Sequence, residues 1–434
     1  MKFLLILPFV LSLSPIVSTA AEPELKIEAI EAAANAPGAT ADSWVAQGNA
    51  RMQEARDKVA HDFAPAEAAF KKALDLKQDS TGAMLGMAWV KNSEHLFEQG
   101  RGWAEKALAI DPDLVDAHAL LGDYEVELGS YDEAYDHYQA AIDSRGDLST
   151  YSRASQLLWI TGDYRQATIL MKKAIDAGGP YPENLAWCHV ELGMMEFNSG
   201  GILPAEMEAK KALEAAPENP RALAMMGRML AAKGQTDEAI AFYKKSIAIT
   251  PTHQPLAALV DLYHLKGDGD AKKRAYEEVI QYHRPDPAKI ASTIAQFGHF
   301  HPIEQASAEL AMFLAEHGSD PDEAVKEAEK AYETYKNIRV EDALAWCYYR
   351  KGDYKKARLL IERALKWKTR EPSLYYHRGM IHMKLGDTAK AADDLKEALA
   401  LNPIFDPIHA DLATKALAEI SAPALPGNSA KEAE

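Results

Sequence analysis

The chain has 434 residues, of which 47% are hydrophobic and 26% are charged. This length exceeds what one compact core supports, so we expect either several domains or an extended array of repeated units. The formal net charge is −17 at pH 7. Because Lys and Arg side chains bind the phosphates of nucleic acids, this charge argues against a nucleic-acid partner.

The first 20 residues have the pattern of a secretory signal peptide. Lys2 precedes an apolar run over residues 3–17, and the small residues Ser18, Thr19 and Ala20 follow. The run is short and wrongly flanked for a membrane anchor, so we predict cleavage near Ala20 and export to the periplasm or the cell exterior. An N-terminal membrane helix that stays attached is the alternative.

No other run of about 18 apolar residues follows, so we expect no stable membrane insertion of the mature chain. We predict that residues 21–40 form an N-terminal linker to the repeated region.

Small residues recur along the chain with nearly one period. Alanines are spaced by 33, 34 or 38 residues at Ala107, Ala141, Ala174 and Ala212, and again at Ala331, Ala364 and Ala398. Glycines keep the same period at Gly86, Gly122, Gly193, Gly227 and Gly379. A fixed period of this length indicates a repeat architecture.

Each repeat reads as a helical hairpin. In residues 118–144, apolar side chains lie three and four apart on both sides of Gly129 and Ser130, where the helix breaks. The predicted buried residues are Leu120, Leu121, Tyr124, Ala134, Tyr138, Ala141 and Ile142. One hairpin cannot bury its apolar face alone, so neighbouring hairpins stack into a solenoid.

Three segments resemble the tetratricopeptide repeat, with its Leu-Gly, Gly-Asp-Tyr, Ala and terminal Pro pattern. They are ALLGDYEVELGSYDEAYDHYQAAI, ALAMMGRMLAAKGQTDEAIAFYKKSIAITP and LYYHRGMIHMKLGDTAKAADDLKEALALNP. The resemblance covers about residues 41–405 and is to exported, bacterial-type members of the family. It implies an all-α, right-handed superhelical solenoid of about ten helix-turn-helix repeats.

The period also predicts how the chain is divided. We expect repeats 1–7 at 41–286, an irregular insertion at 287–303, repeats 8–10 at 304–405, a capping helix at 406–420 and a disordered tail at 421–434.

The stretch Leu-Ala-Trp-Cys occurs twice, at 185–188 and at 344–347, and holds both cysteines of the chain. Four repeats separate the two copies, and in a solenoid each unit contacts only its neighbours. A disulfide needs Cα atoms within about 7 Å. We therefore predict that Cys188 and Cys347 are unpaired and buried, in positions where this fold usually has alanine.

The first helices of the tetratricopeptide family line a concave groove, and the resemblance assigns a stripe of this chain to it. The stripe contains Met87, Trp159, Trp187, Met194, Phe197, Arg228, Trp346, Tyr349, Tyr376 and Met380. Methionine and aromatic side chains form an adaptable apolar surface that suits varied peptides. Alternatively, these side chains pack against each other or against a neighbouring helix.

Charge is unevenly distributed. Residues 101–150 hold twelve acidic and three basic residues, whereas residues 351–400 hold seven acidic and twelve basic ones. Asp116, Asp123 and Glu127 share the groove stripe and would suit the basic end of a ligand, with Arg350 near the other end. The alternative is that these runs are solvated helix faces.

Six of the fourteen histidines lie between residues 253 and 317: His253, His264, His283, His299, His301 and His317. A transition-metal site needs three or four donors, and His299 and His301 alternate without a clear third. We expect surface or capping histidines, and predict neither a metal nor another cofactor. Motifs for nucleophilic, zinc-protease, P-loop or dinucleotide chemistry are missing, so we predict no catalytic residues and no enzyme activity.

The sequence therefore predicts a non-catalytic scaffold or adaptor of the cell envelope that binds a partner peptide or helix in its concave groove. One alternative is a metal- or small-ligand-binding module centred on the histidine-bearing segment 283–317. Another is a self-assembling architectural protein, although no pattern in the chain specifies an oligomeric state.

Overall fold

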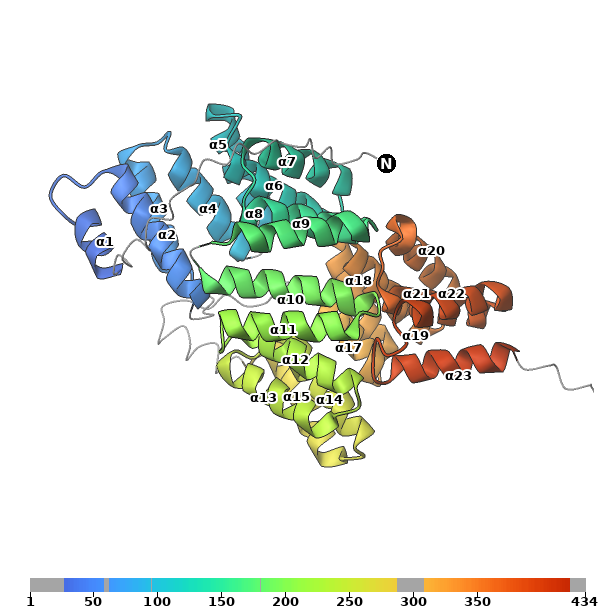
Figure 1. Ribbon diagram of the computed structural model, residues 1–434. Helices are drawn as coiled ribbons and strands as arrows, with labels where there is room; N and C mark the ends of the chain where they lie inside the picture. Colours follow the sequence, from blue (N-terminus) through green and yellow to red (C-terminus); the bar gives the residue numbers. More distant parts are fainter. Residues whose placement is uncertain (1–26, 58–61, 95, 180, 287–307, 422–434) are drawn as a thin grey trace, which may run out of the picture. The chain divides into compact units, whose positions relative to one another are not determined.

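The computed structural model describes residues 27–57, 62–94, 96–179, 181–286 and 308–421 (Figure 1). Regular structure in these ranges consists of α-helices and one 3₁₀ turn, which confirms the all-α fold class. The chain divides into two compact units, one of residues 1–158 and 165–188 and the other of residues 159–164 and 189–434. The predicted signal peptide, the insertion at 287–303 and nearly all of the predicted tail lie outside the described residues.

The helices up to the boundary between the units are α1 (Ile27–Ala34), α2 (Ala41–Asp57), α3 (Ala64–Leu76), α4 (Thr81–Ser93), α5 (Phe97–Ile110), α6 (Val115–Leu128), α7 (Tyr131–Ser144), α8 (Leu148–Ile160), α9 (Tyr164–Ala177) and α10 (Pro182–Asn198). The remaining helices are α11 (Ile202–Ala215), α12 (Pro220–Ala232), α13 (Thr236–Ile249), α14 (His253–Leu265), α15 (Gly269–His283), α17 (Ala308–His317), α18 (Pro321–Thr334), α19 (Ile338–Lys351), α20 (Tyr354–Ala364), α21 (Pro372–Leu385), α22 (Thr388–Leu401) and α23 (His409–Ser421).

Consecutive helices form hairpins, such as α6 with α7 and α21 with α22, and within each unit neighbouring hairpins pack on each other, as α5 does on α6 and α20 on α21. Hairpins α2/α3 to α14/α15 fall within 41–286, and hairpins α17/α18 to α21/α22 fall within 304–405. Helix α23 packs on α22 and α21 and ends the described chain. Through these contacts, a hairpin buries its apolar face against the neighbouring hairpin.

Part of the predicted linker at 21–40 is helical. Residues 27–34 form α1, which packs on α2 and buries Ala34. The side chain of Glu31 also pairs with Arg51 of α2. The stretch IEAIEAAA is rich in strong helix formers, and its contact with α2 explains why it folds.

A left-handed glycine ends the first helix of the α6/α7 hairpin. Gly129 has φ of 82° and donates its N–H to the carbonyl oxygens at the end of α6. Because a residue with a side chain is strained at this φ, glycine is required where the chain reverses into α7.

The first-helix glycine makes room for a ring of the second helix. A Cβ atom built at Gly122 on α6 would lie 2.3 Å from a ring carbon of Tyr138 on α7, and one at Gly48 on α2 would lie 2.4 Å from a ring carbon of Phe70 on α3. The predicted core residues of α6 and α7 are buried, while Ile142 is half-buried. The glycine therefore admits a large side chain between the two helices.

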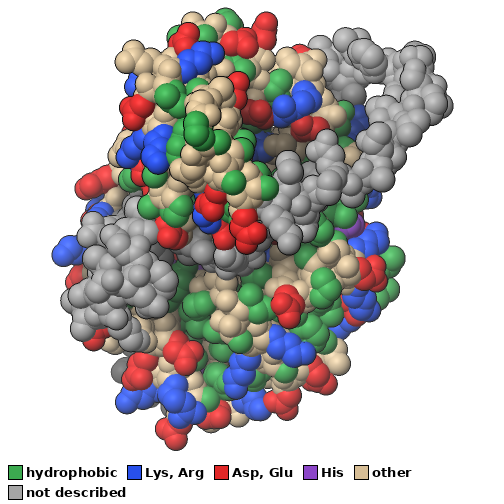
Figure 2. Space-filling view, turned by 90° about the vertical axis from the view of Figure 1, so that its left-hand side faces the viewer, with side chains coloured by type: hydrophobic (Ala, Val, Ile, Leu, Met, Phe, Trp, Pro, Cys, Tyr) green, Lys and Arg blue, Asp and Glu red, His purple; other side chains and the backbone are tan. Residues whose placement is uncertain are grey.

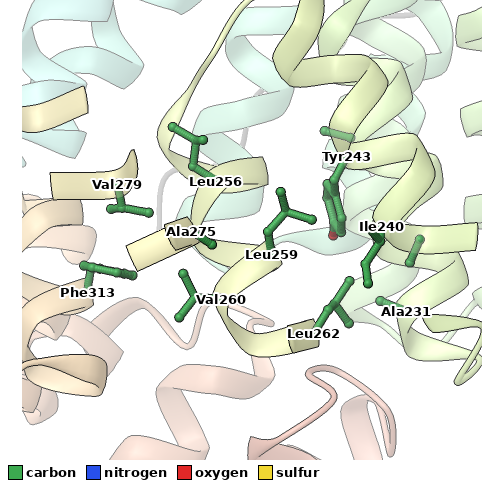
Figure 3. Packing of buried hydrophobic residues seen from close by; sticks show 12 residues of the cluster. Ala231, Ile240, Tyr243, Leu256, Leu259, Val260, Leu262, Ala275, Val279 and Phe313 are labelled. Carbon is green, nitrogen blue, oxygen red and sulfur yellow. The ribbon is translucent and has the colours of Figure 1, made fainter. Parts of the chain in front are cut away.

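In the second unit, one hydrophobic cluster extends over neighbouring hairpins from α12 to α17 (Figure 3). One cluster joins Tyr243 of α13, Leu259 of α14, Val279 of α15 and Phe313 of α17. These helices therefore share one core, as expected for hairpins that cannot bury their apolar faces alone.

Both cysteines are buried and neither takes part in a disulfide bond, which confirms the prediction that they do not pair with each other. The Sγ atom of Cys347 lies 3.4 Å from the carbonyl oxygen of Ala311 on the neighbouring first helix. Burial raises the pKa of the Cys347 thiol to about 12. The side chain is thus a small packing group rather than a nucleophile.

On the face in Figure 2, acidic and basic side chains alternate over the described residues. Elsewhere among the described residues, ion pairs connect neighbouring hairpins, such as Lys351 with Asp322 at 2.6 Å. Within the described ranges, no helix is both long and apolar enough to span a membrane.

We expect Gly122→Ala to lower the free energy of unfolding by about 1–3 kcal/mol, because the added methyl group overlaps the Tyr138 ring. The measurement is urea unfolding followed by circular dichroism. Gly102→Ala on α5 is the matched control, since a Cβ there meets no atom within 4 Å. Removing that helical glycine should stabilise the protein by up to about 1 kcal/mol. Equal effects of the two substitutions would contradict the role of the ring.

Candidate functional site

The predicted acidic end of the groove lies in the first unit, where its carboxylates already have partners. Asp123 accepts hydrogen bonds from the Tyr138 hydroxyl at 2.7 Å and from Nε of Arg153 at 2.9 Å. Asp116 is exposed and pairs with Arg145 at 2.5 Å. A basic ligand would therefore compete with two arginines of the chain itself.

Four further predicted residues between positions 87 and 187 differ in exposure. Met87 is 2% exposed and packs in a core cluster with Phe70. Glu127 and Trp187 are half-buried. Trp159 is buried and lies edge-on to Tyr164, with ring centroids 6.0 Å apart.

Aromatic residues of the second unit stack on one another. Trp346 is 2% exposed and lies between Tyr349, with centroids 4.4 Å apart, and His377, at 4.2 Å. Tyr376 is buried beside Trp346, and buried Phe197 has the Arg228 guanidinium 5.0 Å from its ring centre.

The structure thus corrects the expectation that the whole stripe is open groove surface. Five members are buried, because their side chains fill space between neighbouring helices: Met87, Trp159, Phe197, Trp346 and Tyr376. The half-buried or exposed members are Asp116, Asp123, Glu127, Trp187, Met194, Arg228, Tyr349, Arg350 and Met380. Only these could offer substantial surface to a partner.

In the second unit, the segment between α22 and α23 lies on the first helices. Nδ2 of Asn402 donates to the carbonyl oxygen of Phe197 at 2.8 Å. His409 stacks on Tyr376 with ring centroids 5.0 Å apart, and its Nε2 lies 3.2 Å from a carboxylate oxygen of Glu316. We call the surface formed by Phe197, Asp261, Glu316 and Tyr376 the inner face of the second unit.

Opposite charges are buried together on this inner face. Burial would raise the pKa of Glu316, but the hydrogen bond and charge of His409 outweigh it and lower the pKa to about 2. Burial would lower the pKa of His409, but Glu316 and Asp406 raise it to about 9. At neutral pH the pair is ionised and links α17 to the start of α23.

Asp261, a second carboxyl group on the inner face, has no hydrogen-bonded opposite charge that offsets its burial. Burial, followed by the charge of Asp406, raises the pKa of Asp261 to about 7. His317 lies 3.5 Å from Asp261, and burial lowers the pKa of this histidine to about 4. Clusters of perturbed pKa values mark functional sites in some proteins and structural ion networks in others.

The geometry here favours a structural role for the Glu316–His409 pair. Both groups are satisfied by each other, and they hold residues 402–409 in place. Sequence reasoning did not find this pair, because the two residues lie in different repeats and neither belongs to a motif. Only the stacking of the hairpins brings them together.

The histidine-bearing region contains one further group. Within the described ranges, His253, His283 and Glu309 are the residues whose spacing fits a metal ion. His299 and His301, the pair that stood out in the sequence, lie outside the described residues.

The repeated hairpins and their shared core define a helical-repeat protein. Family models of the tetratricopeptide repeat match residues 344–418 and residues 208–241. These two segments of the chain carry tetratricopeptide repeats. Members of this family are generally protein-interaction scaffolds.

No curated protein matches the chain. Among solved structures, PilF of Pseudomonas aeruginosa is 18% identical, with 50% of this chain and 98% of that chain covered and a TM-score of 0.40. Yeast Tom70 is 16% identical over 91% of this chain and 92% of its own, with a TM-score of 0.40. The human IFIT1 dimer with PPP-AAAA is 16% identical over 75% and 72%, with a TM-score of 0.49. At these values we draw no functional argument from them.

The ion pair predicts a specific pH dependence. The folded pKa of His409 is raised to about 9, so its stabilising contribution is complete below about pH 6.5 and is lost as the pH rises through 9. The thermal midpoint of His409→Gln should therefore lie below that of the wild type at pH 6.5 and approach it near pH 10.

The exposed His264→Gln serves as the control and should follow the wild type over the same range. A deficit of His409→Gln that stays constant from pH 6.5 to 10 would show that the side chain acts by packing alone.

Proposed function

We propose that this protein is a non-catalytic scaffold or adaptor of the cell envelope that binds a partner peptide or helix along the first helices of its repeats. One observation carries the proposal: the inner face of the second unit already holds a segment of the protein's own chain. Residues 402–409 are bound there by ring stacking, an ion pair and a hydrogen bond to a backbone carbonyl. Partner peptides are recognised by the same kinds of contact.

The accessible stripe residues suggest what a partner of the second unit would carry. Met194 and Met380 are half-buried thioethers that adapt to apolar side chains. Arg228 is half-buried and Arg350 is exposed, and both would favour an acidic group. A segment with apolar residues and a carboxylate therefore fits better than a basic one.

The first unit offers different chemistry. Asp116 is exposed, and Asp123 and Glu127 are half-buried on α6. A basic ligand end would gain these carboxylates only by displacing Arg145 and Arg153. Binding there should therefore be weaker and more sensitive to salt.

A photo-crosslinking residue placed at each of two methionines tests the proposed surface. Met194 lies on the first helix of the α10/α11 hairpin, and Met207 is 58% exposed on its second helix. In cells of the native host, we expect position 194 to crosslink a partner protein and position 207 to give no such product. Gel shifts and mass spectrometry measure both.

The two positions are matched because they belong to one hairpin and both replace methionine. Crosslinking from position 207 alone would place the partner on the second helices. Crosslinking between copies of this chain would favour the architectural alternative.

Export is the second part of the proposal. We expect the full-length chain, expressed in a bacterial host, to appear in the periplasm or the medium with its N-terminus cut near Ala20. Fractionation and the intact mass of the purified protein measure this. A chain that keeps its first 20 residues and stays with the membrane would support the attached-helix alternative.

A further inference from the structure

Two histidines and a glutamate meet at one end of the α14/α15 hairpin. His253 is the first residue of α14, His283 is the last residue of α15, and Glu309 lies in the first turn of α17. One potential ligand atom from each lies within 4.8 Å of the other two. Nδ1 of His253 and Nε2 of His283 are 2.8 Å apart.

The topology of the repeat explains this meeting. In an antiparallel helical hairpin, the start of the first helix and the end of the second lie at the same end. The first helix of the next hairpin begins there too. Ligands at residues 253, 283 and 309 therefore converge although 30 and 26 residues separate them along the chain.

The surroundings of the two imidazoles are apolar. His253 lies edge-on to Phe313 with centroids 6.1 Å apart, and His283 lies edge-on to Tyr282 at 4.9 Å. Phe313 and Val279 belong to the adjoining hydrophobic cluster (Figure 3). Burial lowers the pKa of His253 and of His283 to about 4, so both rings are neutral at neutral pH. Neutral imidazole is the form that binds metals.

The hydrogen bonding of the pair is incomplete. Of the two facing nitrogens, only one can carry the shared proton. Nδ1 of His283 is buried and has no hydrogen-bond partner among the described residues. The nearby Arg284 does not use it either, since its guanidinium bonds to Glu323 at 2.5 Å and to Glu327 at 2.7 Å.

We propose that His253, His283 and Glu309 form a binding site for a divalent transition-metal ion of the zinc type. Two imidazole nitrogens and one carboxylate oxygen would be the protein ligands, and water would take the fourth position. Zinc bonds of about 2.0–2.1 Å in a tetrahedral arrangement place the ligand atoms roughly 3.3 Å apart. The facing nitrogens reach that separation by a small side-chain movement, and exposed Glu309 is free to turn inward. The ion would fasten α17 to the α14/α15 hairpin.

A second histidine pair in the first unit provides a natural comparison. His118 and His137 have their Nδ1 atoms 3.0 Å apart, and Nε2 of His118 lies 3.0 Å from the carbonyl oxygen of Pro112. No carboxylate joins this pair with metal-ligand spacing among the described residues. Both histidine pairs place two imidazoles side by side. Among the described residues, a carboxylate converges with such a pair only at His253 and His283.

The test uses the full mature chain without a histidine tag. Zn²⁺ is titrated against a chromophoric chelator, and the bound metal is counted by elemental analysis after dialysis. Co²⁺ is substituted to record the visible absorption of a tetrahedral site. We expect about one equivalent of Zn²⁺, in keeping with a single three-donor site. Binding should be weaker by at least about 10- to 100-fold in His253→Gln and in Glu309→Gln, since even outer-shell changes cost this much.

Glu309→Gln is the decisive variant, because its exposed side chain can change without loss of the fold. Zn²⁺ should raise the thermal midpoint of the wild type and of His137→Gln, but not that of Glu309→Gln. Stoichiometric binding with these differences supports the site. No bound Zn²⁺, or Zn²⁺ retained by both His253→Gln and Glu309→Gln, would overturn it.

Discussion

The contact between a first-helix glycine and a second-helix side chain sets the geometry on which the rest of this protein depends. Tyr138 of α7 lies over Gly122 of α6, and Phe70 of α3 lies over Gly48 of α2, at distances that leave no space for a methyl group. This contact fixes how closely the two helices of a hairpin approach. The spacing in turn decides which side chains reach the next hairpin, so the shared core follows from it.

Burial also explains why the most conspicuous aromatic residues do not form an open surface. Trp346 gains more from stacking on Tyr349 and His377 within the fold than it would from facing water. The buried rings instead form a base for the segment at residues 402–409. In the second unit, the chain itself therefore covers part of the inner face.

The ionised pair of Glu316 and His409 makes that internal contact specific. Two charges taken out of water are tolerated only when each satisfies the other, and here the pKa values of both groups move in the directions that keep them charged. Asp261 lies on the same inner face without an opposite charge of equal strength, and its pKa rises instead. On the inner face, the protonation state of a buried carboxyl group thus depends on whether an opposite charge lies beside it.

The sequence by itself determined the repeat architecture. Alanine and glycine recur with one period because the two helices of a hairpin need small residues where they approach closely. The sequence also predicted the burial of Leu120 and Tyr138 and the absence of a disulfide between Cys188 and Cys347, since these follow from helical spacing and from separation along a solenoid. Only the tertiary structure decided which stripe residues stay accessible, that Glu316 meets His409, and that Glu309 joins His253 and His283. Those contacts join different repeats, so they depend on how the hairpins stack. The periodicity within a single hairpin does not predict which residues of different hairpins meet.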